Sequence, residues 1–148
     1  MSTRETAITN IIDILKDMAP PRPAFVTREP FDLEKLSMRQ FPALLVTTGN
    51  EVREDIAFGG KRQGTISINI TGFVRSDGRE GIAMSVDEKR NNLIERIEEA
   101  LNNARNREIT GQAVTTHVRE VVVENRIPPL GEFTMIVEVK YVFAKGEV

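Results

Sequence analysis

The sequence predicts an α+β domain in which a mainly antiparallel, mixed sheet of about four to five strands has two amphipathic helices packed on one face. Two segments carry apolar residues at helical spacing, and two others alternate apolar and polar residues as half-buried strands do. The length of 148 residues, with 40% hydrophobic and 28% charged residues, suits one soluble domain spanning residues 1–148.

The first helix is expected from Ser2 to about Met18. Ser2 and Glu5 have the spacing of a capping box, in which each side chain bonds a free backbone N–H at the helix start. An apolar stripe at helical spacing follows: Ile8, Ile11, Ile12, Leu15 and Met18. The Pro20-Pro21 pair then ends the helix, because proline has no N–H to donate.

Two strands are expected next. Residues 24–27 form a short strand, and residues 30–38 form a connection with a turn of helix. Residues 41–48 are an almost continuous apolar run, which predicts a strand covered on both faces, with Pro42 at its start or on an edge. Residues 49–62 are polar and contain Gly59-Gly60, so they are predicted as a loop.

The clearest strand covers residues 64–74. Its isoleucines alternate with Thr65, Ser67, Asn69 and Thr71, so one face belongs to the core and the other faces water or a partner. A loop rich in glycine and charge follows at residues 76–81.

The second helix is expected from Ser85 to Ala104. Ser85 and Glu88 repeat the capping-box spacing. Its buried stripe comprises Val86, Leu93, Ile94, Ile97, Leu101 and Ala104. Residues 113–124 form a strand whose alternation changes parity, which predicts a β-bulge near Arg119-Glu120. The last strand, residues 133–143, alternates clearly.

Composition excludes several classes of function. The chain has no cysteine, which rules out disulfides, thiolate metal sites and cysteine nucleophiles. A net charge of −2 argues against general binding to nucleic-acid phosphates. No apolar run approaches the roughly 18–20 residues of a membrane span, and the N-terminus lacks the pattern of a signal peptide. We therefore expect a protein that stays inside the cell until it is assembled.

No set of residues predicts catalysis, a metal or a cofactor, so the protein is not expected to be an enzyme. His117, the only histidine, is interpreted as a surface residue of a strand. The GGKRQG segment, residues 59–64, lacks the Walker pattern and leads into a strand, so it is interpreted as a loop tip that exposes Lys61 and Arg62. The alternative from another class is a small enzyme or ligand-binding domain that uses the polar sheet face.

The order of elements resembles the tail terminator (tail completion) proteins of tailed bacteriophages. The resemblance covers most of the chain and begins with the N-terminal helix and its proline break. It continues through QFPALLVT (40–47), ISINITGFVR (66–75), IEEAL (97–101), ITGQAVTTHVREVVVEN (109–125) and PPLGEFTMIVEVKYVF (128–143).

The resemblance implies a structural virion protein, assembled in the host cytoplasm, whose copies form a ring, usually a hexamer. Such a ring sits on the last ring of tail-tube protein, stops tube polymerisation and presents a surface to neck or head-completion (connector) proteins. The tail sheath is a further partner, and DNA can pass through the ring without sequence-specific contacts; no membrane is involved. A neck or head–tail joining protein of the same virion is the alternative.

Exposure and charge point to four residues as contacts with these partners. They are Lys61, Arg62, Arg75 and Arg79, and they lie in or beside the two polar segments, residues 49–64 and 76–81. We expect these segments, together with the polar sheet face, to carry the protein–protein contacts.

Overall fold

A computed structural model describes residues 3–56, 60–76, 85–102, 108–109, 112–126 and 130–144. The helices in these ranges are α1 (Thr3–Asp17), α2 (Val86–Leu101) and two short 3-10 helices, Leu33–Lys35 and Met38–Gln40. The strands are β1 (Phe25–Thr27), β2 (Ala43–Asp55), β3 (Lys61–Arg75), β4 (Glu108–Ile109), β5 (Gln112–Asn125) and β6 (Leu130–Ala144).

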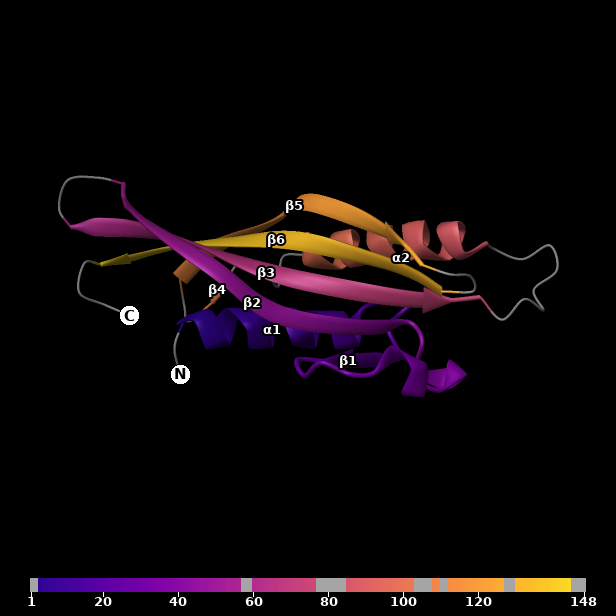
Figure 1. The fold of residues 1–148 in the computed structure, drawn as a ribbon. Coiled ribbons are helices and arrows are strands. Elements are labelled where there is room, and N and C mark those ends of the chain that lie inside the picture. Colours follow the sequence, from indigo (N-terminus) through magenta and orange to yellow (C-terminus); the bar gives the residue numbers. More distant parts are fainter. Residues whose placement is uncertain are drawn as a thin grey trace.

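The strands form one sheet in the order β1-β2-β3-β6-β5-β4, in which β1 runs parallel to β2 and the other neighbours are antiparallel. Strand β4 has only two residues, so five strands make the body of the sheet. Both helices lie on the same face, where α1 contacts β2, α2 contacts β3 and β6, and the helices touch each other (Figure 1). The predicted fold class is confirmed.

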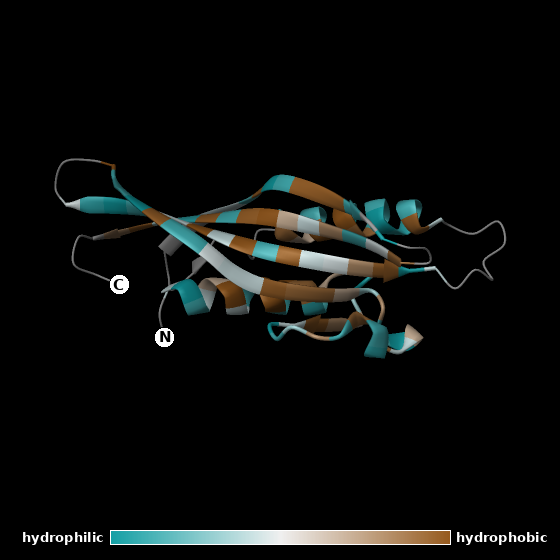
Figure 2. Ribbon diagram, in the orientation of Figure 1, coloured by the Kyte–Doolittle hydropathy of each residue, from teal (hydrophilic) through white to brown (hydrophobic). Residues whose placement is uncertain are grey.

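The core lies between this face and the helices. Alternate residues of the central strands point inward and are fully buried, as Ile66, Ile68 and Ile70 of β3 are. They meet the predicted apolar stripes of the helices, and hydrophobic residues accordingly dominate the middle of β2, β3 and β6 while the outer side of α2 is hydrophilic (Figure 2). The opposite face of β3, with Thr65 and Asn69, is partly exposed, as its alternation predicts.

Two local predictions from the sequence are confirmed at the level of individual bonds. The hydroxyl of Ser85 accepts a hydrogen bond from the backbone N–H of Glu88 over 3.2 Å, which starts α2 at the predicted place. The pairing of β5 with β6 shifts register between Val118 and Glu120, where the change of parity predicts a bulge. Ser2 and Ala104 lie outside the described residues.

The prediction that residues 41–48 are covered on both faces is wrong for most of that strand. Leu44 and Val46 are fully buried beneath the helices, whereas Leu45 points to the other face and is only half-buried. Cover on the second face exists only at the start of β2. There Ala43 pairs with Phe73, whose ring packs against Phe31 at a centroid distance of 5.5 Å.

The prediction of a loop at residues 49–62 is also wrong for residues 49–55 and 61–62, while residues 57–59 lie outside the described residues. Strand β2 continues through this segment to Asp55, and β3 already begins at Lys61, which pairs with Ala144 of β6. These strand ends form a three-stranded extension, residues 51–55, 61–65 and 140–144, which together with Ile56 we call the arm and which projects past the start of α1 (Figure 1). Polar residues suit the β2 part of the arm because residues 52–55 are all exposed, whereas β6 keeps Tyr141 and Phe143 buried.

Gly72 lies where two strands leave no space for a side chain. A Cβ atom at this position would lie 2.2 Å from Cζ of Phe133, its partner on β6. We expect Gly72→Ala to displace that fully buried ring and to lower the free energy of unfolding by about 1–3 kcal/mol in urea titrations. Gly49→Ala is the milder comparison, because its Cβ atom would lie 3.1 Å from the backbone oxygen of Ser67, a tight contact that a shift of a few tenths of an ångström relieves, and equal losses would contradict this packing.

Candidate functional site

A cluster of four polar side chains fastens the arm to the rest of the domain. Its centre is Glu51 of β2, whose side chain is only 5% exposed. This carboxylate accepts hydrogen bonds from Arg4 of α1 over 3.2 Å, from Arg53 over 2.7 Å and from the hydroxyl of Tyr141 over 2.5 Å. Arg4 also donates to the carbonyl oxygen of Gly49 over 3.0 Å. This group, called the Glu51 cluster, therefore joins α1, β2 and β6.

Local features of three strands place these side chains. The register shift after Thr48 turns Glu51 to the helix-facing side, opposite the buried Ile66. The ring of Tyr141 lies across Gly64 on the neighbouring strand, where a Cβ atom would be 2.5 Å from the ring. The guanidinium of Arg53 lies 5.4 Å from the centre of the Phe143 ring, a cation–π contact that holds it beside Glu51.

The electrostatics of the cluster stabilise the arm and do not prepare a proton transfer. Burial opposes ionisation of Glu51, but hydrogen bonds from Tyr141, Arg53 and Arg4 and the charge of Arg53 outweigh it, so the pKa of Glu51 is lowered. Burial, the hydrogen bond to Glu51 and the negative charge of Glu51 raise the pKa of Tyr141 to about 12. Neither group titrates near pH 7, where a general acid or base works best.

The surface of the arm mixes exposed apolar residues with charges. Val52, Ile56 and Val142 are 56%, 45% and 39% exposed, although each is a large hydrophobic residue. Charged neighbours include Glu54 and Lys61, which are exposed. These exposed apolar side chains make the arm a candidate for contact with another protein.

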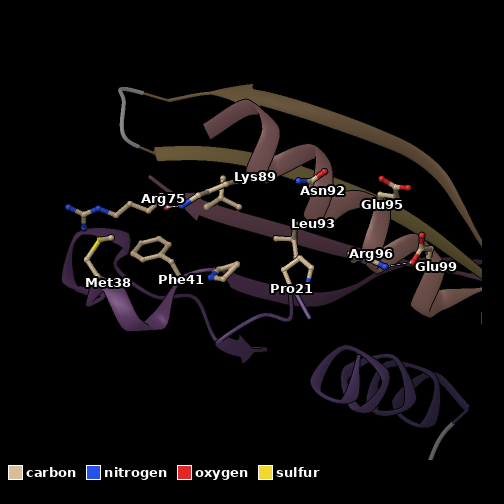
Figure 3. A pocket seen from close by; sticks show the side chains of 12 residues that line it. Pro21, Met38, Phe41, Arg75, Lys89, Asn92, Leu93, Glu95, Arg96 and Glu99 are labelled. Atoms are coloured by element: carbon tan, nitrogen blue, oxygen red, sulfur yellow. Dashed lines mark hydrogen bonds and ion pairs between the residues drawn. The ribbon is translucent and has the colours of Figure 1, made fainter. Parts of the chain in front are cut away.

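A groove of about 620 Å³ lies between α2 and the residues that precede β2 (Figure 3). Its apolar lining consists of Pro21, Met38, Phe41, Pro42, Val74 and Leu93. Arg75 at the end of β3 and Lys89 of α2 bring basic side chains to the groove, and Glu95 and Glu99, also of α2, bring acidic ones (Figure 3). Nε of Arg75 is buried and has no hydrogen-bond acceptor among the described residues.

The predicted contact residues do not form one site on one chain. Lys61 and Arg75 are the first and last residues of the 15-residue β3, so about 46 Å separates them at roughly 3.3 Å per residue. Lys61 is exposed on the arm, whereas Arg75 is half-buried beside the groove. Arg62 lies on the arm and is engaged there, since its Nε is 3.0 Å from Oδ1 of Asp55. Arg79 lies outside the described residues.

His117 is an exposed strand residue, as predicted. Its Nε2 lies 3.1 Å from Oε1 of Glu138 on the neighbouring β6. Within the ranges described, no three His, Asp or Glu side chains are placed to share a metal ion. The polar sheet face carries hydrogen-bonded pairs of side chains, namely His117 with Glu138 and Thr71 with Thr134.

Sequence reasoning missed the Glu51 cluster and the groove because both join distant segments. Glu51 is 47 residues from Arg4 and 90 residues from Tyr141 in the chain. Only the single tyrosine in an otherwise apolar row of β6 hinted that a polar partner lies nearby.

In the described part of the chain, the arm and the groove are two candidates for function, and they lie at opposite ends of β3. Among the described helices none is long and apolar enough to cross a membrane. The chain matches no protein-family model and no curated protein.

Proposed function

We propose that this protein is a structural assembly subunit, six copies of which form a ring on the end of a phage tail tube. The ring stops polymerisation of the tube protein and offers its other side to neck or head-completion proteins. Its function needs surfaces and no catalysis, and its place is the virion after assembly in the host cytoplasm. Two grounds support this function: the order of elements resembles that of tail terminator proteins, and the arm presents an exposed surface.

The arm supports this function because it is both exposed and held in place. Val52 and Ile56 are about half exposed, which favours burial against another protein. The Glu51 cluster ties the root of the arm to α1 and β6, so little conformational freedom is lost on binding. A projecting, prearranged apolar surface is what a subunit needs in order to join a ring.

The test is mass measurement in solution followed by electron microscopy, alone and with tail-tube subunits. Six-fold rings, or rings that form on tube ends and limit tube length, are expected. A strict monomer that does not bind tail tubes and holds a small molecule in the groove would instead favour a ligand-binding domain. Attachment to connector proteins without any effect on tubes would favour the neck protein.

Lys61→Glu is expected to weaken the association of subunits without affecting the folding of each subunit. Because Lys61 is exposed at the start of β3, we expect its free energy of unfolding to stay within about 0.5 kcal/mol of the original protein. We expect subunit association, measured by sedimentation, to weaken by about fivefold, as loss of roughly 1 kcal/mol implies. Arg62 is left unchanged because its reversal would also break the ion pair with Asp55.

Lys16→Glu is the matched control, since it reverses an exposed lysine on α1 that lies neither on the arm nor among the residues lining the groove. It should leave both folding and association unchanged. If Lys61→Glu unfolds the domain, or if both variants associate equally well, Lys61 is not a contact residue.

A further inference from the structure

We propose that the arm of one copy docks into the groove of the next, so that copies of this chain join head to tail. This inference rests on the proposed function and names the contact by which neighbouring subunits of the ring would meet. The arm offers Val52 and Ile56, and the groove offers an apolar lining that includes Met38, Phe41 and Leu93.

The position of the two surfaces requires two copies. They lie at opposite ends of β3, about 46 Å apart, and β3 is a continuous strand between them. An arm therefore cannot reach the groove of its own chain. A contact between two different surfaces of the same protein is heterologous, and it produces a closed ring when its rotation closes.

The apolar parts of the two surfaces suit each other. The groove, at about 620 Å³, has room for several side chains, and Figure 3 shows Met38, Phe41, Pro21 and Leu93 around it. Met38 is itself 42% exposed. Docking would remove water from Ile56 of one copy and Met38 of the next at the same time, which stabilises the contact.

The charges identify the occupant as an arm rather than an apolar small molecule. Nε of Arg75 beside the groove is buried without an acceptor in the described part of the chain. Next to Ile56 the arm carries the exposed Glu54, whereas the neighbouring Asp55 is already paired with Arg62 over 3.0 Å. The carboxylate of Glu54 on an incoming arm would pair with the half-buried Arg75 beside the groove.

A second ion pair can form across the same interface, with the basic residue on the arm and the acidic residue in the groove. Lys61 on the arm is exposed, and Glu95 of α2 lines the groove, while its neighbour Glu99 is paired with Arg96 over 3.1 Å. The predicted contact residues Lys61 and Arg75, which are far apart in one chain, would thus belong to the two halves of one interface. Both surfaces carry both signs of charge, so a single orientation of docking is favoured over others.

Cysteine cross-linking tests the contact directly, because the chain contains no cysteine of its own. The variant Met38→Cys with Ile56→Cys places one thiol in the groove and one on the arm, both at exposed positions. Oxidation should join copies into a ladder of covalent multimers that ends at the closed ring. Each single substitution should give no product larger than a dimer, since a lone thiol forms one disulfide.

The matched control is Met38→Cys with Val122→Cys. Val122 is 36% exposed on β5, within the row Val121–Val123, which is the other exposed apolar segment of a strand. If this control forms the ladder and the arm variant does not, the copies meet through β5 and the proposal is overturned. A stable monomer without cross-links overturns it as well.

The outcomes also separate this contact from the proposed function. Rings that form without any arm-to-groove ladder would leave the function standing and remove the contact. A ladder from a protein that does not limit tail-tube length would establish the contact and remove the function.

Discussion

Ile68→Asp is expected to unfold the domain. Ile68 is fully buried at the centre of β3, between Thr48 of β2 and Val137 of β6, and it points toward the helices. An aspartate there would be an unpaired charge in the apolar core or would have to bind a proton. Such changes cost more than about 4 kcal/mol, which is most of the stability of a typical domain. Circular dichroism at pH 7 should show loss of the cooperative unfolding transition.

Asn69→Asp is the matched control for that change. It introduces the same side chain at the next residue, which points to the other face of the sheet and is partly exposed. Its neighbours across the strands, Thr47 and Ile136, carry no charge. We expect a folded protein with a change of about 0.5 kcal/mol or less. Equal damage from both substitutions would contradict the assignment of the two faces.

Ile68→Asp and Asn69→Asp test the part of the fold that the sequence does predict, namely which residues of β3 point into the core. Where one side of a helix or strand is buried, the spacing of its apolar residues predicts which side chains point inward. The inward positions of Ile66, Ile68 and Ile70 could therefore be predicted from the sequence. The bulge in β5 could be predicted for the same reason. Val118 and Val121 can point to the same face of the sheet only if an extra residue lies between them.

The β2 part of the arm could not be predicted because residues 52–55 are all exposed. Apolar periodicity disappears where every residue of a strand meets water, and these residues then resemble a loop. The two-residue β4 has too few side chains to show any pattern. Pairing in the arm is set by the register that β3 and β6 already have in the core, from Ile68↔Val137 out to Lys61↔Ala144.

The candidate site was predicted only in part. The exposed position of Lys61 followed from the neighbouring glycines and charges, and the structure agrees. Its distance from Arg75 did not follow, because it depends on the whole of residues 61–75 being one strand. The partner of Arg62 did not follow either, since Asp55 reaches it only when the predicted loop is a paired hairpin.

Glu51→Gln is the second large effect, and it should loosen the arm from α1. Glutamine keeps the shape of Glu51 but removes the charge that accepts hydrogen bonds from Arg4, Arg53 and Tyr141. Breaking a buried pair costs about 3–5 kcal/mol, but the two arginines are 40% and 36% exposed and regain water. We therefore expect a loss of about 2 kcal/mol in urea titrations at pH 7.

The dependence of this loss on pH distinguishes the cluster from simple packing. The pKa of Glu51 is lowered in the folded state, so its ionised form stabilises folding fully above its unfolded pKa of about 4.3. That contribution disappears as pH falls through the lowered pKa, where Glu51 binds a proton. The stability difference between the original protein and Glu51→Gln should thus be constant above about pH 5 and shrink below about pH 4. Glu54→Gln, on the exposed side of the arm, should show a small difference at every pH, and a pH-independent loss for Glu51→Gln would mean that shape, not charge, holds the arm.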